Sequence, residues 1–162
     1  MRVIDWTSFQ NGLTAIAIHD SASVVGQSII ATINDVIELV EPEIMIELFG
    51  SDFYDTFLEA LEETSPEAKW ITLRNLCIKG LKFFVYIEYD SRRQTYSTEA
   101  GEMSQIAQNQ TNRNTFRKHR TLYNAGVTNL QIVYDYINEN IEDYPDYEDL
   151  GFEFERINAF NI

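Results

Sequence analysis

The amino-acid sequence predicts a mainly α-helical protein: a bundle of four to five helices, with a long arm between two helices and an extended C-terminal tail. Apolar residues recur every third or fourth position over several long segments, which is the spacing of one face of an α-helix. Between two of these segments lies a polar stretch, residues 90–116, with too few apolar side chains to bury itself. Loops of this length are uncommon in compact domains and are usually functional or disordered.

Length and charge define the class of protein. The chain has 162 residues, which suits one domain with a sizeable core, and its net charge is −14. An acidic surface repels phosphate, so tight binding to DNA, RNA or an anionic membrane is disfavoured. The sequence has no run of eighteen apolar residues and no signal-peptide pattern at its N-terminus, so we expect no membrane segment.

We divide the chain into three parts. Residues 1–25 form an N-terminal extension, residues 26–150 form the helical domain with the arm at 91–114, and residues 151–162 form a C-terminal docking tail. The extension carries weak signals, although residues 13–18 predict a short strand after the turn at Asn11 and Gly12.

Helical spacing begins at Gln27. We expect this helix to end or kink at Glu41, because the residue before a proline is biased away from the helical region. Pro42 suits the first turn of a second helix, which would end at Gly50 as its C-terminal cap.

Capping residues predict the next two helices. Ser51 can cap a short helix that runs to about Glu63. Ser65, followed by Pro66 as the first helical residue, begins a helix of about 25 residues with Gly80 near its middle.

A last long helix follows the arm, and it also has a central glycine, Gly126. A glycine inside a helix costs about 1 kcal/mol relative to alanine, so a packing reason is expected at Gly80 and at Gly126. We therefore predict that these two helices pack antiparallel, with their backbones in close approach.

The sequence offers little catalytic chemistry. His19 and His119 are the only histidines, and neither belongs to the Glu-x-x-His pattern of di-iron bundles. The three carboxylates Glu59, Glu62 and Glu63 crowd one helix end, where a solvated face is the expected interpretation. Cys77 is the only cysteine, so an internal disulfide is excluded. It lies on an apolar helix face, which favours a buried structural thiol. We expect no enzymatic activity, no cofactor and no metal.

A basic patch stands out in this acidic chain. Its members near the start of the last helix, beside His119, are Arg113, Arg117, Lys118 and Arg120. Two interpretations remain open: local pairing with the protein's own acids, or a positive face that meets the acidic face of an identical neighbour. Contacts of the second kind are head-to-tail and close into rings when the rotation allows.

The arm and the tail each place a few apolar residues in polar surroundings, as segments that order on contact do. We expect the arm to lie against a neighbouring subunit; the tail either folds back on its own bundle or docks on another molecule. The predicted contact residues are Tyr96, Met103 and Ile106 in the arm, and Phe152, Phe154, Ile157 and Phe160 in the tail.

Several segments resemble the head–tail connector (portal adaptor) proteins of tailed bacteriophages. They are EIMIELFGSDFYDTFLEAL, KWITLRNLCIKGLKFFVYIEYD, TEAGEM, TLYNAG and ERINAFNI, and the resemblance spans residues 30–162. It implies a helical subunit that assembles into a ring, commonly twelvefold, between the portal protein and the next neck or tail protein. The genome would pass through the ring without specific binding. The ring would assemble in the host cytoplasm and remain in the neck of the virion.

Two functions therefore follow from the sequence. The first is a structural virion protein that forms a connector ring. The alternative is a soluble acidic module that binds proteins or mimics nucleic acid, which the net charge of −14 would suit.

Overall fold

The computed structural model describes residues 2–98, 101–104, 112–151 and 155–157. Four α-helices dominate: α1 (Val24–Phe49), α2 (Ser51–Glu62), α3 (Ala68–Gln94) and α4 (Asn112–Glu139). Two short 3-10 helices, Trp6–Phe9 and Ile141–Asp143, and a hairpin of β1 (Thr95–Thr98) and β2 (Gly101–Ser104) complete the described elements. The predicted mainly α-helical bundle is confirmed.

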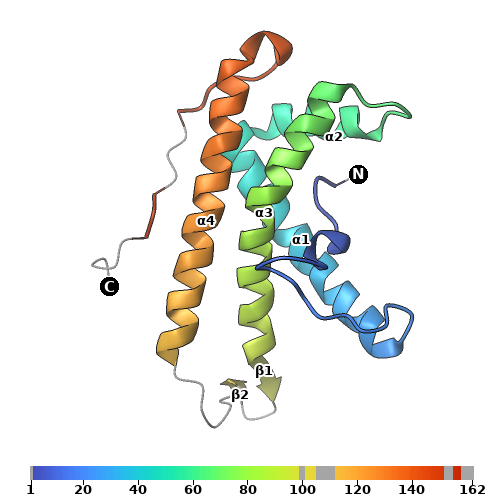
Figure 1. Cartoon of the computed structure of the whole chain (residues 1–162), viewed down its shortest axis with the longest axis vertical. Coiled ribbons are helices and arrows are strands. Elements are labelled where there is room, and N and C mark those ends of the chain that lie inside the picture. Colours follow the sequence, from blue (N-terminus) through green and yellow to red (C-terminus); the bar gives the residue numbers. More distant parts are fainter. Residues whose placement is uncertain (1, 99–100, 105–111, 152–154, 158–162) are drawn as a thin grey trace.

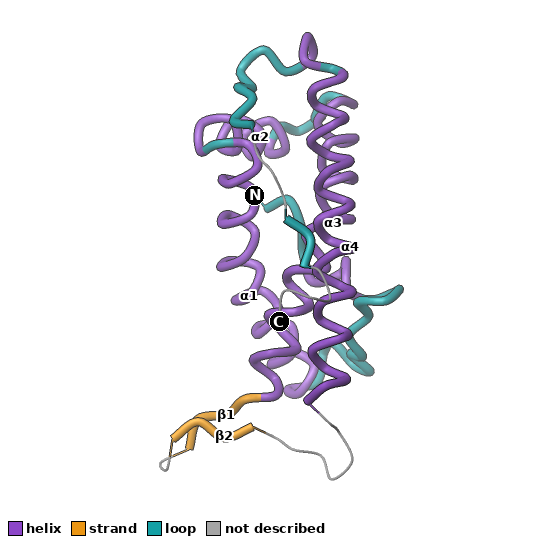
Figure 2. Tube along the Cα trace, turned by 90° about the vertical axis from the view of Figure 1, so that its left-hand side faces the viewer, coloured by secondary structure: helices purple, strands orange, loops and turns teal. Residues whose placement is uncertain are grey.

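Helix α3 lies at the centre of the bundle. It contacts α4 along one side and α1 on the other, and α2 packs across the end where α1 stops and α3 begins (Figures 1 and 2). The outer faces of α1 and α4 therefore point to opposite sides of the molecule, which matters for any contact between copies.

The two central glycines lie where α3 and α4 run antiparallel and touch (Figure 1). A Cβ atom on Gly80 would lie 2.6 Å from the buried side chain of Leu130, and one on Gly126 would lie 2.6 Å from the ring of Phe84. These distances are too short for real carbon atoms, so both positions require glycine for space. The predicted antiparallel packing is confirmed, and the backbones approach closely at Gly80, where the added Cβ would lie 3.3 Å from the main-chain nitrogen of Leu130; at Gly126 the ring of Phe84 fills the space.

Helix α1 continues through Pro42, so the prediction of two helices separated there was wrong. A proline inside a helix removes one main-chain hydrogen bond and usually breaks the helix. Here the residues on both sides, Val40, Glu41 and Met45, are buried. Their packing holds the helical path across the proline, and the helix ends at Phe49 before Gly50 as predicted.

The junction between α1 and α2 depends on Gly50. Its φ of 79° is a left-handed value that glycine adopts without strain, and its N–H donates to the carbonyl of Ile46 at 2.8 Å. Gly50 also stands at the cap position of α2, and Ser51 is the first residue of that helix. The predicted cap at Ser51 was therefore wrong, and α3 likewise begins at Ala68, two residues after Pro66.

Residues 2–23 pack against the bundle through several of their side chains, so the prediction of a separate N-terminal extension at 1–25 was wrong. The side chains of Val3, Ile4, Phe9 and Ile16 are buried in the main hydrophobic cluster. Residues 13–18 form no strand, because no other strand of the described structure lies beside them. Their burial nevertheless alternates as in a strand.

The arm at 91–114 is shorter than predicted, because the flanking helices extend into it. Helix α3 continues to Gln94 and α4 begins at Asn112. Between them, β1 and β2 form an antiparallel hairpin in which Tyr96 is opposite Met103. Ile106 lies outside the described residues. The sequence does not signal this hairpin, since its two-residue connection, Glu99 and Ala100, is no typical hairpin turn.

The segment after α4 returns to the bundle before the tail begins. Tyr144 and Tyr147 are buried against Phe49, Phe53 and Trp70, with ring centroids 5.2–6.3 Å apart. Edge-to-face contacts of this kind stabilise beyond the area they bury. Residues up to 147 therefore pack on the helical bundle.

The described part of the tail lies along α4 (Figure 1). The main-chain N–H of Ile157 donates to the side-chain oxygen of Asn124 at 3.0 Å, and the amide of Asn124 donates to the carbonyl of Ile157 at 3.1 Å. Arg156 donates to Thr128 at 3.0 Å. Residues 155–157 therefore fold back on their own bundle, whereas Phe152, Phe154 and Phe160 lie outside the described residues.

Filling either central glycine should weaken the bundle. Gly80→Ala and Gly126→Ala are each expected to lower the free energy of unfolding by about 1–3 kcal/mol, the usual cost of overpacking a core. Helix propensity alone would favour alanine by about 1 kcal/mol. A loss of stability would therefore show that the close contact outweighs helix propensity. Urea unfolding measures it, with Asn75→Ala on the exposed side of α3 as the control. A more stable Gly80→Ala variant would contradict the close contact.

Candidate functional site

The basic patch lies at the N-terminal end of α4, and part of it is paired within the chain. Lys118 Nζ donates to the hydroxyl of Tyr86 at 2.8 Å and lies 4.7 Å from the centre of that ring. The same nitrogen lies 3.3 Å from a carboxylate oxygen of Asp90, and His119 Nε2 lies 2.9 Å from that oxygen. Local pairing, one of the two interpretations of the patch, therefore applies to Lys118 and His119.

This cluster shifts two pKa values. Burial alone would raise the pKa of Asp90, but the hydrogen bond from His119 and the charge and hydrogen bond of Lys118 hold it below its ordinary value. Burial alone would lower the pKa of Lys118, but the hydrogen bond with Tyr86 and the charge of Asp90 raise it. Both groups are thus kept in their charged forms. No local sequence pattern signals the contact between His119 and Asp90, because 29 positions separate them.

The remaining cations of the patch are Arg113, Arg117 and Arg120. Arg117 is exposed, Arg120 is half-buried, and neither has an acidic partner among the side chains that the structure describes. Arg113 lies in the first turn of α4, and its side chain is outside the described part. Two arginines of the patch therefore keep charge that the bundle does not neutralise.

The outer face of α1 carries the opposite charge. Its exposed residues at helical spacing include four carboxylates, namely Asp35, Glu38, Glu43 and Glu47. The apolar side chains of Leu39 and Ile46 lie among them and are 49% and 44% exposed. The one basic group paired with this face is Arg2, whose guanidinium lies 3.3 Å from Glu38 in the described structure.

Acidic residues also gather at the end of the bundle that holds α2. Residues 43–67 and 135–149 contain fifteen Asp and Glu and no Lys or Arg. The fold brings these two segments together, because the chain after α4 packs at the junction of α1 and α2, where Tyr147 contacts Phe49 and Phe53. The hairpin and the basic patch lie at the opposite end, so charge is separated along the molecule.

A buried carboxylate anchors the N-terminal segment. Glu41 is fully buried, and its two oxygens accept hydrogen bonds from the main-chain N–H groups of Val3 and Ile4, each at 3.0 Å. The hydroxyl of Tyr54 donates to the same carboxylate at 2.8 Å. Burial and the neighbouring Glu41 raise the pKa of the Tyr54 hydroxyl, so it stays protonated and can donate. Glu41 was expected only to end or kink a helix, and no sequence signal indicated that it binds the N-terminal segment.

Arg74 completes the anchor from α3. Its Nε donates to the carbonyl of Val3 at 2.8 Å, and its guanidinium lies 3.8 Å from Asp5. The N–H and C=O groups at the start of the chain are thus satisfied by two different helices, which fixes the position of the segment that follows.

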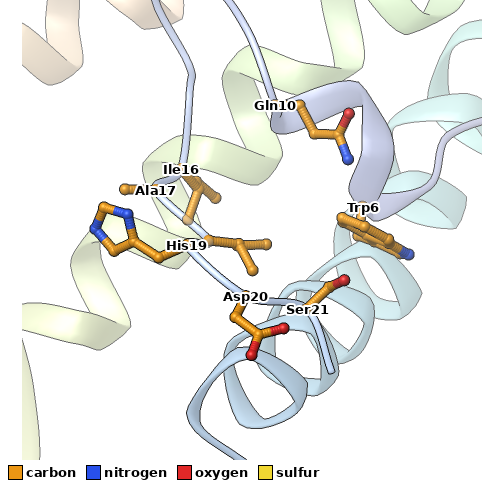
Figure 3. A pocket seen from close by; sticks show the side chains of 8 residues that line it. Trp6, Gln10, Ile16, Ala17, His19, Asp20 and Ser21 are labelled. Carbon is orange, nitrogen blue, oxygen red and sulfur yellow. The ribbon is translucent and has the colours of Figure 1, made fainter. Parts of the chain in front are cut away.

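A cavity of about 480 Å³ opens beside this segment (Figure 3). Trp6, Gln10 and Ile16 line it together with His19 and Asp20. His19 and Asp20 are exposed and form no hydrogen bond with each other in the described structure. The geometry gives no nucleophile–base pair at this position.

The other candidates for chemistry are structural or solvent-exposed. Cys77 is fully buried, and burial raises the pKa of its thiol, so the reactive thiolate is disfavoured. Glu59, Glu62 and Glu63 are exposed, and no group of three possible ligands among the described residues is arranged to hold a metal ion. No helix in the described ranges is both long and apolar enough to span a membrane.

Comparisons with family models, curated proteins and solved structures found no match to the chain. The resemblance to connector proteins therefore rests on short sequence segments alone. The surfaces described here, two oppositely charged outer faces and one anchored N-terminal segment, are the features from which a function can be argued.

Removing the buried carboxylate should destabilise the fold. Glu41→Ala leaves two main-chain N–H groups and one hydroxyl unpaired, so we expect the free energy of unfolding to fall by about 3 kcal/mol or more. Tyr54→Phe removes one hydrogen bond to a charged group and should cost about 1.5–3 kcal/mol. Glu38→Ala, one turn earlier and exposed, is the matched control and should change stability by no more than about 1 kcal/mol. Equal effects at positions 38 and 41 in chemical unfolding would contradict the anchor.

The Asp90 cluster predicts a dependence of stability on pH. Because the pKa of Asp90 is lowered by folding, its contribution is complete above its ordinary pKa of 3.8 and is lost as the pH falls through the lower folded value. Asp90→Asn should therefore be less stable than the parent at pH 7, and the difference should shrink below about pH 4. The exposed Asp35→Asn variant is the control. A difference at Asp90 that is constant from pH 7 to pH 3 in unfolding experiments would disprove the coupling.

Proposed function

We propose that the protein is a structural virion protein that assembles into a connector ring at the head–tail junction of a tailed bacteriophage. Two observations support the proposal. The sequence segments resemble connector proteins, and the bundle carries an acidic outer face on α1 and unpaired basic groups on α4, on opposite sides of α3.

Opposite charges on opposite faces favour one kind of contact between copies. The basic start of α4 in one copy can meet the acidic face of α1 in the next, and each copy then uses two different surfaces. Such heterologous contacts produce rings when the rotation closes and open filaments when it does not. The charge arrangement therefore supports repeated assembly, and the number of subunits follows from the rotation angle.

Apolar side chains on the same faces would contribute most of the binding energy. Leu39 and Ile46 are half-exposed on α1, and Phe116 and Ile132 are half-exposed on α4. Exposed charges mainly steer association and fix orientation, because salt screens them over about 8 Å. The tail residues 155–157 also lie on α4, so in this arrangement they would be at or near the contact between copies.

The ends of the bundle would meet other components. In a connector ring, the portal protein would lie on one side and the next neck or tail protein on the other. An acidic channel lining would let DNA pass without adhering, because like charges repel and no phosphate contacts form.

One observation favours the alternative function, a soluble acidic module. Residues 43–67 and 135–149 place fifteen carboxylates at one end of the bundle, where Lys69 lies 3.6 Å from Glu67 as a basic group, and this acidic surface could bind a basic protein in place of nucleic acid. A module of this kind would act as a monomer, so the oligomeric state separates the two functions.

Reversing the unpaired charges should weaken assembly. We expect Arg117→Glu with Arg120→Glu to shift the population toward monomer by about tenfold or more, because like charges would then face each other across the contact. Adding Asp35→Arg and Glu43→Arg on α1 should restore assembly by exchanging the two charges. Native mass spectrometry at low salt measures the populations.

The matched control changes the net charge by the same amount on α3 instead of α4. Lys79→Glu with Lys82→Glu alters two cations of α3 and should leave assembly unchanged. Equal weakening by both double variants would assign the effect to net charge. A chain that stays monomeric at all concentrations, alone and with portal protein, would exclude the ring.

A further inference from the structure

Two segments of the main chain could each accept a further β-strand beside them. One is residues 15–18 in the N-terminal segment, and the other is the hairpin of β1 and β2 at the end of α3. They are separate in the sequence, and both lie in the half of the bundle that holds the C-terminal end of α3 (Figure 1).

Residues 15–18 have unused hydrogen-bonding groups. The N–H groups of Ala15 and Ile16 donate to the carbonyls of Gly12 and Phe9, at 3.2 and 2.7 Å. The N–H groups of Ala17 and Ile18 form no hydrogen bond with any described residue. Burial alternates along the segment: Ile16 is buried, whereas Ala15 and Ala17 are exposed. The segment is not paired as a strand, but its alternating burial and these N–H groups would allow it to pair with one.

The surroundings of this segment suit a second strand. Cavities of about 480 and 340 Å³ lie beside it, and Ile16 and Ala17 line both of them. Residues 6–18 contain no charged side chain, in a chain with a net charge of −14. Another copy could approach this segment with less electrostatic repulsion than at the acidic faces, and depletion of charge is typical of the centre of protein interfaces.

The hairpin is formed as a sheet but has only two strands in the described structure. Isolated two-stranded hairpins are marginally stable in water. Strand β1 has the sequence Thr-Tyr-Ser-Thr, which has no charge and consists mostly of residues that favour strands. The hairpin extends beyond the end of the bundle, away from the helices (Figure 2).

We infer that strand β1 of one copy pairs with residues 15–18 of a neighbouring copy and forms a three-stranded sheet between subunits. The inference rests on the proposed assembly, since it needs a second copy. Both segments belong to the half of the bundle that holds the C-terminal end of α3, so in a ring with subunits side by side the hairpin of one copy would reach toward this segment of the next. Main-chain hydrogen bonds of this type supply affinity, and the alternating pockets supply specificity.

Cysteine pairs test this contact directly. Ala17→Cys and Ser97→Cys are made in separate full-length chains, which are then mixed and oxidised mildly. We expect a disulfide-linked pair of chains to form about tenfold faster or more than in the control mixture, because strands that are held together react at a high effective concentration. The control combines Ser97→Cys with Ala22→Cys, which is exposed in the loop before α1. The parent chain provides the background, since Cys77 is buried.

Four outcomes separate the hypotheses. Rapid linking of the Ala17 and Ser97 variants, with wild-type-like assembly by native mass spectrometry, supports the intersubunit sheet. Assembly into rings with linking no faster than in the control overturns the sheet and leaves the ring. A persistent monomer without linking overturns both the sheet and the ring. A double variant that forms its disulfide within one chain shows that the hairpin pairs with its own N-terminal segment, and this result also overturns the inference.

Discussion

The close contact of α3 with α4 is the constraint on which the rest of the structure depends. Gly80 and Gly126 leave no room for a Cβ atom, and the side chains of Leu130 and Phe84 fill the space. Dispersion forces and burial of apolar area act over this close-packed contact, so even one added methyl group would change the stability of the fold. With α4 held on one side, α3 has its other side free for α1, and the outer faces of α1 and α4 must then point in opposite directions.

The N-terminal segment is held by polar groups inside an otherwise apolar core. A buried carboxylate is costly unless its oxygens are hydrogen-bonded, and Glu41 meets this condition with two main-chain donors and the hydroxyl of Tyr54. The arrangement is specific, because any shift of residues 3 and 4 leaves three polar groups unpaired. It also explains how residues with weak secondary-structure signals reach a defined position, with their alternating apolar side chains against the bundle.

Charge acts at two levels in this protein. Net charge disfavours association in general, whereas in the proposed ring the opposite charges on α1 and α4 would decide where two copies meet. Asp90 partly neutralises Lys118 and also contacts His119, so these groups link α3 to α4, while Arg117 and Arg120 have no acidic partner among the described side chains. A connector ring would use this difference: internal pairs maintain the subunit, and unpaired groups orient its neighbours.

The sequence by itself determined the helices and the reason for their central glycines, because apolar periodicity and glycine inside a helix are local signals. It also located the basic patch and the buried Cys77. Only the tertiary structure decided that α1 continues through Pro42, that Glu41 anchors residues 3 and 4, and that His119 meets Asp90. In the first case, burial on both sides of the proline outweighs the lost hydrogen bond. In the other two, the partners are 29 to 38 positions apart, and no local pattern reports which distant group satisfies a buried polar atom.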